Sequence, residues 1–436
     1  MVTPTILPRA NHSISRSLID PDALKVLNRL RQFNYTAYLV GGSVRDLLLG
    51  RRPKDFDIGT SARPQEVKRL FRNCWIIGRR FRLAHVKFGT KTIEVATFRR
   101  QLSEEEVAAQ EAAAQAAEAA ELAQAQEPGR RDRPRVPVAD NTFGTPEQDA
   151  SRRDFTVNAL FYDIASFSII DYVGGMEDLK ARVIRCIGDP DVRFEEDPVR
   201  MLRAIVLAAR LDFTVDPPVV DAIRRHAELI TRSSPARLLE EFYKILRSGA
   251  SERAFRELAE VGLLAHLAPE LLRDRGQALW PYAASLDAYR HRFDSTPESL
   301  TNPLLLGTLL VPQGFTAGRR PRMSEEDEPP VKDPPPMLGR MSLPRRDVER
   351  LRQILGLQRR LLDLSASPRA RRALLHRGPF QEALTWLEIH GQRPEVLEHW
   401  KGFREATVLP QEESRAERPG RRRRRRRRGP RRPPIL

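Results

Sequence analysis

Cysteine is scarce in this chain of 436 residues, and the two that occur, Cys74 and Cys186, form no CxxC or Cys/His metal-binding spacing. That scarcity argues against a disulfide framework or a structural zinc site and is typical of proteins from the reducing cytosol. Apolar runs of membrane-spanning length are also missing, as is a signal-peptide pattern. We therefore expect no membrane association and a cytoplasmic location.

Positive charge is what the chain has in excess, with a formal net charge of +17. Ten of these charges are the arginines at 421–428, 431 and 432, so the rest of the chain is basic as well. A surplus of this size attracts polyanions. The composition thus predicts a nucleic-acid partner, and it predicts that 411–436 is a disordered basic tail.

The stretch 38–60, YLVGGSVRDLLLGRRPKDFDIGT, predicts a short strand, a glycine turn and a helix. Ser43, three residues before Asp46, predicts a capping box at the start of that helix. A helix N-terminus that follows glycines offers free N–H groups to a phosphate, and a cation in its first turn adds a formal charge. The groups expected to bind a phosphate are Gly41, Gly42, Ser43 and Arg45.

Two carboxylates come next, at Asp55 and Asp57, and in a strand both would face one side. Two negative charges at so short a distance need a counter-ion, and Mg²⁺, which prefers oxygen ligands, is the natural one. A hairpin is expected over 86–98 with its turn near Gly89. Alternation along its return strand favours a surface position for Glu94, and a place beside the two aspartates is the alternative.

The rest of the chain is organised around one insertion and a long helical region. A low-complexity insertion to which we assign no chemistry is expected over 101–138. The motif SRRDFTVNALFYDI at 151–164 then carries polar groups able to hydrogen-bond a ribose and phosphates, among them Arg153, Asp154 and Asn158. From Val219 the pattern is almost wholly helical, with a Pro- and charge-rich loop over 311–336.

The sequence Glu196-Asp197-Pro198 predicts the start of a strong helix, with Asp197 as its N-cap and Pro198 at its first position. Arg200 follows Asp197 by three residues and Glu196 by four, so these side chains can meet on one helix face. An Asp beside an Arg can hydrogen-bond the edge of a nucleobase. The alternative is an intrahelical ion pair worth only about 0.3–0.5 kcal/mol.

Gly42-Ser43 followed at a distance by Asp55-Phe56-Asp57 resembles the signature of the DNA polymerase beta nucleotidyltransferase superfamily. Five segments also occur in the order of the motifs of its class II enzymes, the bacterial poly(A) polymerases and CCA-adding tRNA nucleotidyltransferases. These segments are LVGGSVRDLLLGRRPKDFDIGT, RRDFTVNAL, DYVGGMEDLKARVIR, EEDPVRMLRA and PARLLEEFYKIL. The resemblance covers about residues 12–250.

The resemblance implies an α+β nucleotidyltransferase head with a small mixed or antiparallel sheet, then an all-α neck and body and a disordered basic tail. The expected ranges are an irregular lead 1–20, a head 21–190, a neck 191–250 that recognises the nucleobase, an RNA-binding body 251–410 and the tail 411–436. The resemblance also implies roles for individual residues. It favours a place beside the two aspartates over a surface position for Glu94, and nucleobase recognition over an intrahelical ion pair for Asp197 and Arg200. Asp55, Asp57 and Glu94 would be the catalytic metal ligands, and the nucleotide would contact Gly41, Gly42, Ser43, Arg45, Arg153, Asp154, Asn158, Asp197 and Arg200.

Within the family, the stretches 12–30 and 70–89 and the Arg-rich tail are more similar to the bacterial poly(A) polymerases. This similarity implies an Mg²⁺-dependent polynucleotide adenylyltransferase that adds AMP from ATP to RNA 3′ ends without a template, as in the mRNA polyadenylation that promotes RNA turnover. The tail would then be a contact for RNA-decay machinery. The alternatives are a CCA-adding tRNA nucleotidyltransferase and a non-catalytic RNA-binding protein on the same fold.

Overall fold

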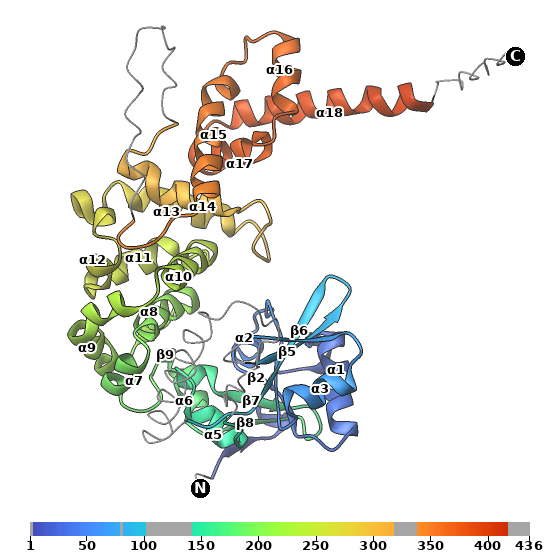
Figure 1. Ribbon diagram of the computed structural model, residues 1–436, viewed down its shortest axis with the longest axis vertical. Coiled ribbons are helices and arrows are strands. Elements are labelled where there is room, and N and C mark those ends of the chain that lie inside the picture. Colours follow the sequence, from blue (N-terminus) through green and yellow to red (C-terminus); the bar gives the residue numbers. More distant parts are fainter. Residues whose placement is uncertain (1–2, 79–81, 102–141, 318–337, 417–436) are drawn as a thin grey trace, which may run out of the picture. The chain divides into compact units, whose positions relative to one another are not determined.

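The computed structural model describes residues 3–78, 82–101, 142–317 and 338–416 (Figure 1). Most of the predicted insertion, most of the Pro-rich loop and most of the basic tail lie outside these residues. The chain divides into two compact units, Met1–Pro297 with Pro335–Leu343, and Glu298–Pro334 with Pro344–Leu436. The short segment 335–343 thus belongs to the first unit, although it follows part of the second in sequence.

A mixed eight-stranded sheet lies at the centre of the N-terminal part of the first unit (Figure 1). Its strands lie in the order β1-β8-β7-β2-β3-β6-β5-β4; β3 and β6 are parallel, and the other neighbours are antiparallel. The α+β head expected from the sequence is therefore confirmed. The strands are β1 Thr5–Leu7, β2 Ala37–Val40, β3 Asp57–Thr60, β4 Cys74–Ile77, β5 Leu83–Phe88, β6 Lys91–Thr97, β7 Leu160–Asp163 and β8 Ser168–Asp171, and a separate pair joins β9 Val183–Ile184 to β10 Thr214–Val215.

The predicted hairpin is formed by β5 and β6 with Gly89 in its turn, where the φ of +61° suits glycine. The helices that surround the sheet and follow it are mostly short. They are α1 Pro21–Gln32, α2 Gly42–Leu48, α3 Pro64–Leu70, α5 Pro146–Ser151, η3 Thr156–Asn158, α6 Gly175–Ala181, α7 Pro190–Glu196, α8 Val199–Leu211, α9 Pro217–His226, η4 Ala227–Arg232, α10 Pro235–Arg247, α11 Ser251–Glu260, α12 Leu263–Leu267, η5 Pro269–Gly276 and α13 Leu279–Arg290, with short 3-10 turns at Arg9–Asn11 and Arg16–Leu18.

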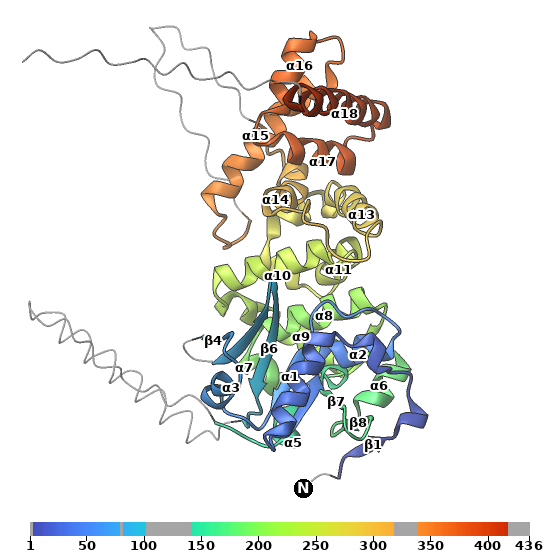
Figure 2. The same ribbon diagram turned by 90° about the vertical axis from the view of Figure 1, so that its right-hand side faces the viewer.

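The two faces of the sheet differ. Helices α1 and α3 contact strands β2 to β6 (Figure 2), and the register partners Ile58 and Val95 are buried. Strand alternation turns the neighbouring register partners, Asp57 and Glu94, to the opposite face. The carboxylates therefore lie on the face that α1 and α3 do not cover.

A row of register partners crosses the strands on the face that α1 and α3 do not cover, and this row decides where the site lies. At its β7 end the side chains are apolar and buried, because Phe161 of β7 pairs with Val40 of β2 and both belong to a hydrophobic cluster with Phe98. The row continues from Val40 to Asp57 and then to Glu94 on the next strands. The carboxylates thus stand where a packed apolar half of the sheet face gives way to a more exposed half.

The apolar periodicity of 254–271 predicts one long amphipathic helix, but this segment is broken in the structure. Gly262 has a φ of +83°, and Pro269 interrupts the pattern again, so α11, α12 and η5 replace one continuous helix. Positive φ is costly for most residues but not for glycine, and proline cannot donate a helical hydrogen bond. Both residues are visible in the sequence, but helical periodicity outweighed them in the prediction.

The second unit is helical, as expected. Gly307 of α14 lets Trp386 and Leu351 pack closely, and the buried Trp400 donates its indole N–H to Leu361 O at 2.9 Å. These contacts give the unit a core of its own. Its elements are α14 Asn302–Leu310, η6 Val311–Gln313, α15 Arg345–Leu362, α16 Pro368–Leu375, α17 Phe380–His390 and α18 Pro394–Ala416.

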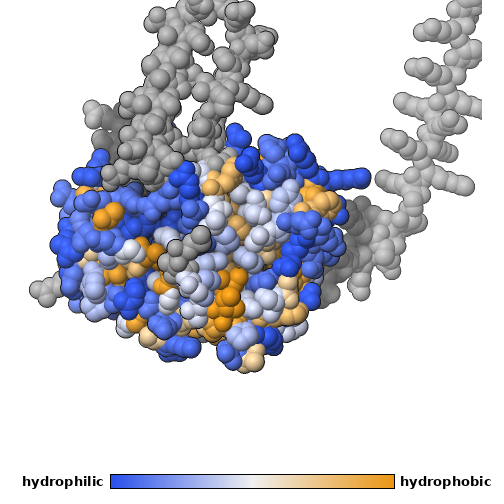
Figure 3. Space-filling view, turned by 90° about the horizontal axis from the view of Figure 1, so that it is seen from below, coloured by the Kyte–Doolittle hydropathy of each residue, from blue (hydrophilic) through white to orange (hydrophobic). Residues whose placement is uncertain are grey.

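The surface seen from the end that carries the N-terminus is mainly hydrophilic, with small separate apolar patches (Figure 3). Among the described helices, none combines the length and apolar character needed to cross a bilayer.

Candidate active site

Gly41 forms the turn between β2 and α2, with a φ of +72° and a ψ of −134°. The predicted strand, glycine turn and helix are present. Ser43 lies inside α2 and donates its hydroxyl hydrogen to Val40 O at 3.0 Å. The capping box predicted from Ser43 and Asp46 is wrong, because the N-cap is Gly41 rather than Ser43 and the helix therefore begins two residues earlier than predicted, at Gly42.

Gly41→Ala is expected to lower the free energy of unfolding by about 1–3 kcal/mol, because its φ/ψ values suit glycine almost alone. An added Cβ would also lie 2.9 Å from Nη1 of Arg153. The nucleotide transfer expected from the sequence should fall, since Arg153 must move; urea denaturation and a transfer assay measure the two effects. Gly50→Ala is the matched control, because Gly50 has a φ of +67° but no atom within 4 Å of an added Cβ. Equal losses of activity in both variants would contradict the role given to Arg153.

Asp57 is the first residue of β3 and the register partner of Glu94 on β6. The pKa of Asp57 is raised to about 6, mainly by burial and also by the charges of Glu94 and Asp55, whereas the charge of Arg153 opposes the shift. Asp55 precedes the strand and its side chain is 72% exposed, so the expectation that both aspartates lie in one strand is wrong. The reason is that β2 ends at Val40, the partner of Asp57, and leaves no pairing residue for Asp55.

The three carboxylates fit a divalent cation by their chemistry. Among the residues that the structure describes, no three His, Cys, Asp or Glu side chains gather closely enough to hold a metal ion. However, ionised Asp57 is penalised by burial and repelled by both other carboxylates, and hard cations prefer oxygen donors. A cation beside Asp57 would offset this penalty and this repulsion.

Arg153 is held beside this group by a buried carboxylate. Its Nε and Nη2 donate to Asp149 Oδ2 at 3.2 and 2.9 Å, and its Nη1 donates to Asn158 O at 3.1 Å. Burial alone would raise the pKa of Asp149, but Arg153 and Arg152 together lower it. Asp149 was not singled out from the sequence, although its spacing of three and four residues from the two arginines is a signal for helical ion pairs.

Arg45 is buried, with an exposed fraction of 3%, and donates to Asp46 Oδ1 and to the side-chain oxygen of Asn158. Asn158 in turn donates from Nδ2 to Asp154 Oδ1 at 3.2 Å. The structure therefore brings Arg45, Asn158 and Asp154 into one network. The guanidinium of Arg45 is already neutralised by Asp46, so it fixes Asn158 rather than offering a free charge.

Of the two ion pairs expected in the helical neck, that of Arg200 with Glu196 is present, whereas Asp197 has a different partner. Asp197 accepts two hydrogen bonds from Arg237 of α10, at 2.9 and 2.7 Å, whereas Arg200 donates to Glu196 at 2.7 Å. Asp197 and Arg200 therefore have separate ion-pair partners. Asp197 also lies between α7 and α8, where it accepts the N–H of Val199 at 3.2 Å, so α8 begins one residue later than predicted.

Two arginines of the neck were not identified from the sequence as ion-pair partners of predicted site residues. They are Arg203, the partner of Asp154, and Arg237, the partner of Asp197. Arg203 of α8 lies 2.6 Å from Asp154 Oδ2, which joins the neck to the network around Asn158. Arg237 lies 40 residues from Asp197, so no local pattern relates them. Only its helical spacing with Glu241 and Lys244 was visible in the sequence, and that spacing says nothing about Asp197.

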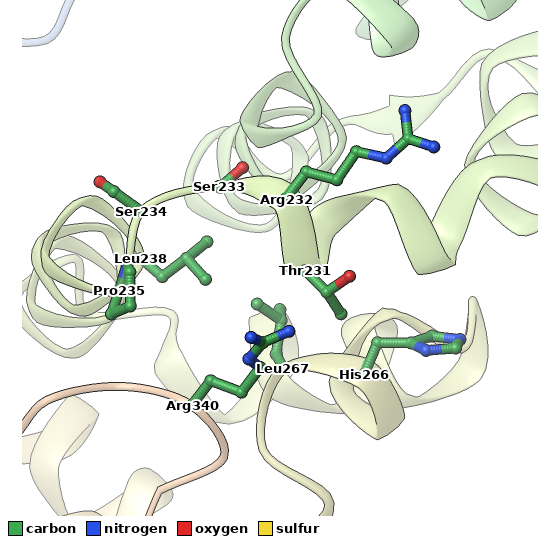
Figure 4. Close-up of a pocket in the computed structure, with 9 residues that line it drawn as sticks. All are labelled: Thr231, Arg232, Ser233, Ser234, Pro235, Leu238, His266, Leu267 and Arg340. Atoms are coloured by element: carbon green, nitrogen blue, oxygen red, sulfur yellow. The ribbon is translucent and has the colours of Figure 1, made fainter.

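A separate cavity of about 240 Å³ lies at the N-terminal end of α10 (Figure 4). Arg340 reaches it from the segment 335–343, which is anchored where the Gly339 N–H donates to Glu270 Oε2 at 2.9 Å. Its lining includes Arg232 and His266 but no Asp or Glu. The cavity is thus chemically unlike the carboxylate site and contributes no residue to it.

Family models match three parts of the chain. They are described as "Poly A polymerase head domain" over 37–185, "Probable RNA and SrmB- binding site of polymerase A" over 212–274 and "Polymerase A arginine-rich C-terminus" over 337–433. The first match contains the carboxylates and Arg153. The second contains Arg237, the partner of Asp197.

Curated relatives fall into two groups. Poly(A) polymerase I of Salmonella typhi is 48% identical over 271 residues, and that of Escherichia coli O157:H7 is 47% identical over 269 residues; each alignment covers 62% of this chain and 54% of the relative. The CCA-adding enzyme of Geobacillus sp. is 36% identical over 257 residues, covering 59% of this chain and 56% of that enzyme. The chain thus spans about half the length of the curated relatives that it matches.

A solved structure extends the similarity to the helical region. The Bacillus stearothermophilus CCA-adding enzyme in complex with CTP is 28% identical, has a TM-score of 0.61, and is covered to 83% of its length by 89% of this chain. The likeness therefore includes the fold of the helical part as well as the head.

Proposed function

Because this chain belongs to the family of poly(A) polymerases and CCA-adding tRNA nucleotidyltransferases, we propose that it adds AMP from ATP to RNA 3′ ends without a template. The observation that carries the proposal is the pairing of Asp57 with Glu94 on the open face of the sheet, beside Arg153. The higher identity to poly(A) polymerase I than to the CCA-adding enzymes favours adenylate addition. The product would be a poly(A) tail that promotes RNA turnover.

In this proposal Asp55, Asp57 and Glu94 would hold Mg²⁺, which would neutralise phosphate charge and lower the pKa of the attacking 3′-hydroxyl. The protein supplies the rest by positioning and by fixed charge. Arg153, held by Asp149, keeps a positive charge at the carboxylates where the triphosphate arrives. The hydroxyl attacks the α-phosphate and pyrophosphate leaves, so that one phosphodiester bond replaces one phosphoanhydride bond.

The remaining nucleotide contacts follow the network of the head. Gly41 and Gly42 keep the backbone near two guanidiniums free of side-chain bulk, since a Cβ at Gly41 would lie 2.9 Å from Nη1 of Arg153 and one at Gly42 would lie 3.4 Å from Nη2 of Arg45. We assign the triphosphate to this turn, with Ser43 and Arg45 behind it. We assign the sugar to Asp154 and Asn158, which hydrogen-bond to each other.

We assign the adenine base to Asp197 and Arg200, with Asp197 oriented by Arg237. Arg237→Gln should lower the ratio of kcat/KM for ATP over CTP by about tenfold, because a carboxylate without its bidentate partner no longer rejects the wrong base edge. Arg237→Lys keeps the positive charge but loses the planar guanidinium, so its ratio of kcat/KM for ATP over CTP should lie between those of wild type and Arg237→Gln. Steady-state kinetics with each nucleotide measure the ratio.

Arg224→Gln is the matched control for that prediction. Arg224 is also on a neck helix, but its ion pair with Asp221, at 3.5 Å, is exposed on both sides. An unchanged ratio in Arg224→Gln with a lowered one in Arg237→Gln is expected. An unchanged ratio in Arg237→Gln would remove Asp197 from nucleobase recognition.

RNA would be held by the basic body over 251–410, and its affinity should fall steeply with salt. The head 21–190 and the neck 191–250 would carry catalysis and base choice. A cytoplasmic location belongs to the same proposal. The proposed contact of the basic tail with RNA-decay proteins concerns residues that lie mostly outside the described part of the chain.

The experiment that tests the function is a product assay of the purified protein with Mg²⁺. Unstructured RNA and tRNA lacking its 3′ end are each given ATP or CTP, and the products are sized. Long ATP-dependent tails on both RNAs are expected. Addition that stops after C, C and A on tRNA alone would establish the CCA-adding alternative, and no transfer to any RNA would favour the non-catalytic one.

A further inference from the structure

The cross-strand row that carries the carboxylates continues to the edge of the sheet. Glu94 on β6 pairs with His85 on β5, and His85 pairs with Trp75 on β4, the last strand of the sheet. Residues in register on neighbouring strands point to the same face. Trp75 therefore stands on the face of Asp57, about 14 Å away across three strand spacings.

Trp75 is unusually open for an indole. Half of its surface is exposed (50%), and Ile77, which shares its face of β4, is 49% exposed. Lys87 of β5 projects from the same face and places Nζ 5.2 Å from the centre of the indole ring. An aromatic surface and a cation are thus combined on the open part of the catalytic face.

We propose that Trp75 and Lys87 form a binding site for the single-stranded RNA that leads to the reacting 3′ end. The indole would stack on a base a few nucleotides upstream, and Lys87 would neutralise a neighbouring phosphate. The inference rests on the proposed function. It adds a contact that lies in the head itself rather than in the helical body.

Three observations favour RNA over a protein partner at this surface. The site lies in the same register row as the carboxylates, so a primer that ends at Asp57 and follows this row would run over it. The charge beside the ring is positive, which suits a phosphate backbone. A flat exposed aromatic ring next to a cation is the arrangement that binds single-stranded nucleic acid without sequence preference, since every base has a stacking face.

Trp75→Ala in the full chain is expected to weaken binding of a fluorescein-labelled oligo(A) by about five- to 100-fold, the usual worth of one stacked base. Trp75→Phe keeps an aromatic face and should restore most of the affinity. The KM for ATP should stay unchanged in both variants. A dinucleotide primer, too short to reach Trp75, should be extended equally well by wild type and by Trp75→Ala.

Phe33→Ala is the matched control. Phe33 is also an exposed aromatic residue (49%) with a cation over its ring, Arg29 at 5.1 Å, but it ends α1, which packs on the other face of the sheet. Its replacement should leave the affinity for oligo(A) unchanged. An equal loss in Phe33→Ala and Trp75→Ala would overturn the proposal, because exposure alone would then explain the effect.

Lys87→Gln tests the phosphate contact separately. The slope of log affinity for oligo(A) against log salt concentration should become shallower by about 0.7, the value for one phosphate contact on a single strand. Trp75→Ala should leave this slope unchanged, since stacking releases no counter-ion. An unchanged slope in Lys87→Gln would remove Lys87 from the site.

Failure of this inference is distinguishable from failure of the proposed function. If wild-type protein makes long ATP-dependent tails and Trp75→Ala binds oligo(A) within twofold of wild type, the RNA site on β4 is refuted and the adenylyltransferase stands. In that case the exposed edge strand would be a surface for another protein. If wild-type protein transfers no nucleotide, the proposed function itself fails.

Discussion

Asp57→Asn is expected to lower kcat/KM for nucleotide transfer by about a hundred- to a thousandfold, while it raises the thermal unfolding midpoint in EDTA. The activity falls because the partly buried carboxylate that is proposed to hold a cation is replaced by a neutral amide. The stability rises for the same reason, since ionised Asp57 is desolvated and repelled by Glu94 and Asp55. A transfer assay and thermal unfolding without metal measure the two effects.

The pH dependence of this stabilisation has a definite sign. The pKa of Asp57 is raised in the folded protein to about 6 from 3.8, so the folded state keeps its proton over that interval. The ionisation penalty is absent below about pH 4, grows as the pH rises towards 6, and is fully present above it. The difference in midpoint between Asp57→Asn and wild type should follow the same course.

Asp55→Asn is the control for that experiment. The side chain of Asp55 is 72% exposed, and its charge is the smallest of the causes that raise the pKa of Asp57, so its neutralisation should raise the unfolding midpoint much less than Asp57→Asn does. If Asp57→Asn left the midpoint and the transfer rate unchanged, Asp57 would be neither a strained carboxylate nor a metal ligand. Saturating Mg²⁺ should stabilise wild type more than Asp57→Asn, because ligand that binds only the folded state adds stability.

Arg153→Gln should lower the free energy of unfolding by about 3 kcal/mol, because it removes one of two guanidiniums from the buried Asp149. Transfer should fall by about a hundredfold or more, since Arg153 also opposes the raised pKa of Asp57. The acid limb of the pH–rate profile should therefore move to higher pH. Denaturation and pH-dependent kinetics measure these changes.

Arg152→Gln separates the two roles of Arg153. Arg152 pairs with the same carboxylate at 2.7 Å, yet Asp57 is influenced by Arg153 and not by Arg152. The control should therefore destabilise the protein but leave the acid limb in place. Because the pKa of Asp149 is lowered, the stability it contributes is present above pH 3.8 and is lost as pH falls through the folded pKa. Identical pH profiles for both variants would contradict the assignment of Arg153.

Much of the head could be predicted from local pattern. Strand formers before Gly41 and a helix after it produced the predicted turn, and Gly89 with alternating residues produced the predicted hairpin. The order of five motifs identified the family, which the family-model matches over 37–185 and 212–274 bear out. Local predictions failed where a helix-breaking residue was outweighed by helical periodicity, as at Gly262. They also failed where a neighbouring strand offers no pairing residue, as for Asp55 beyond the end of β2.

The amino-acid sequence by itself determined which residue types lie on each strand face and helix, because backbone geometry and side-chain alternation act over a few residues. Only the tertiary structure decided that β6 lies directly beside β3, with β5 and β4 further towards the edge of the sheet. This order places Glu94 next to Asp57. It also paired Asp197 with Arg237 across 40 residues, and it placed Trp75 in the same cross-strand row as Asp57 and Glu94. Such partners are selected by burial and pairing over the whole unit, and no short-range pattern encodes them.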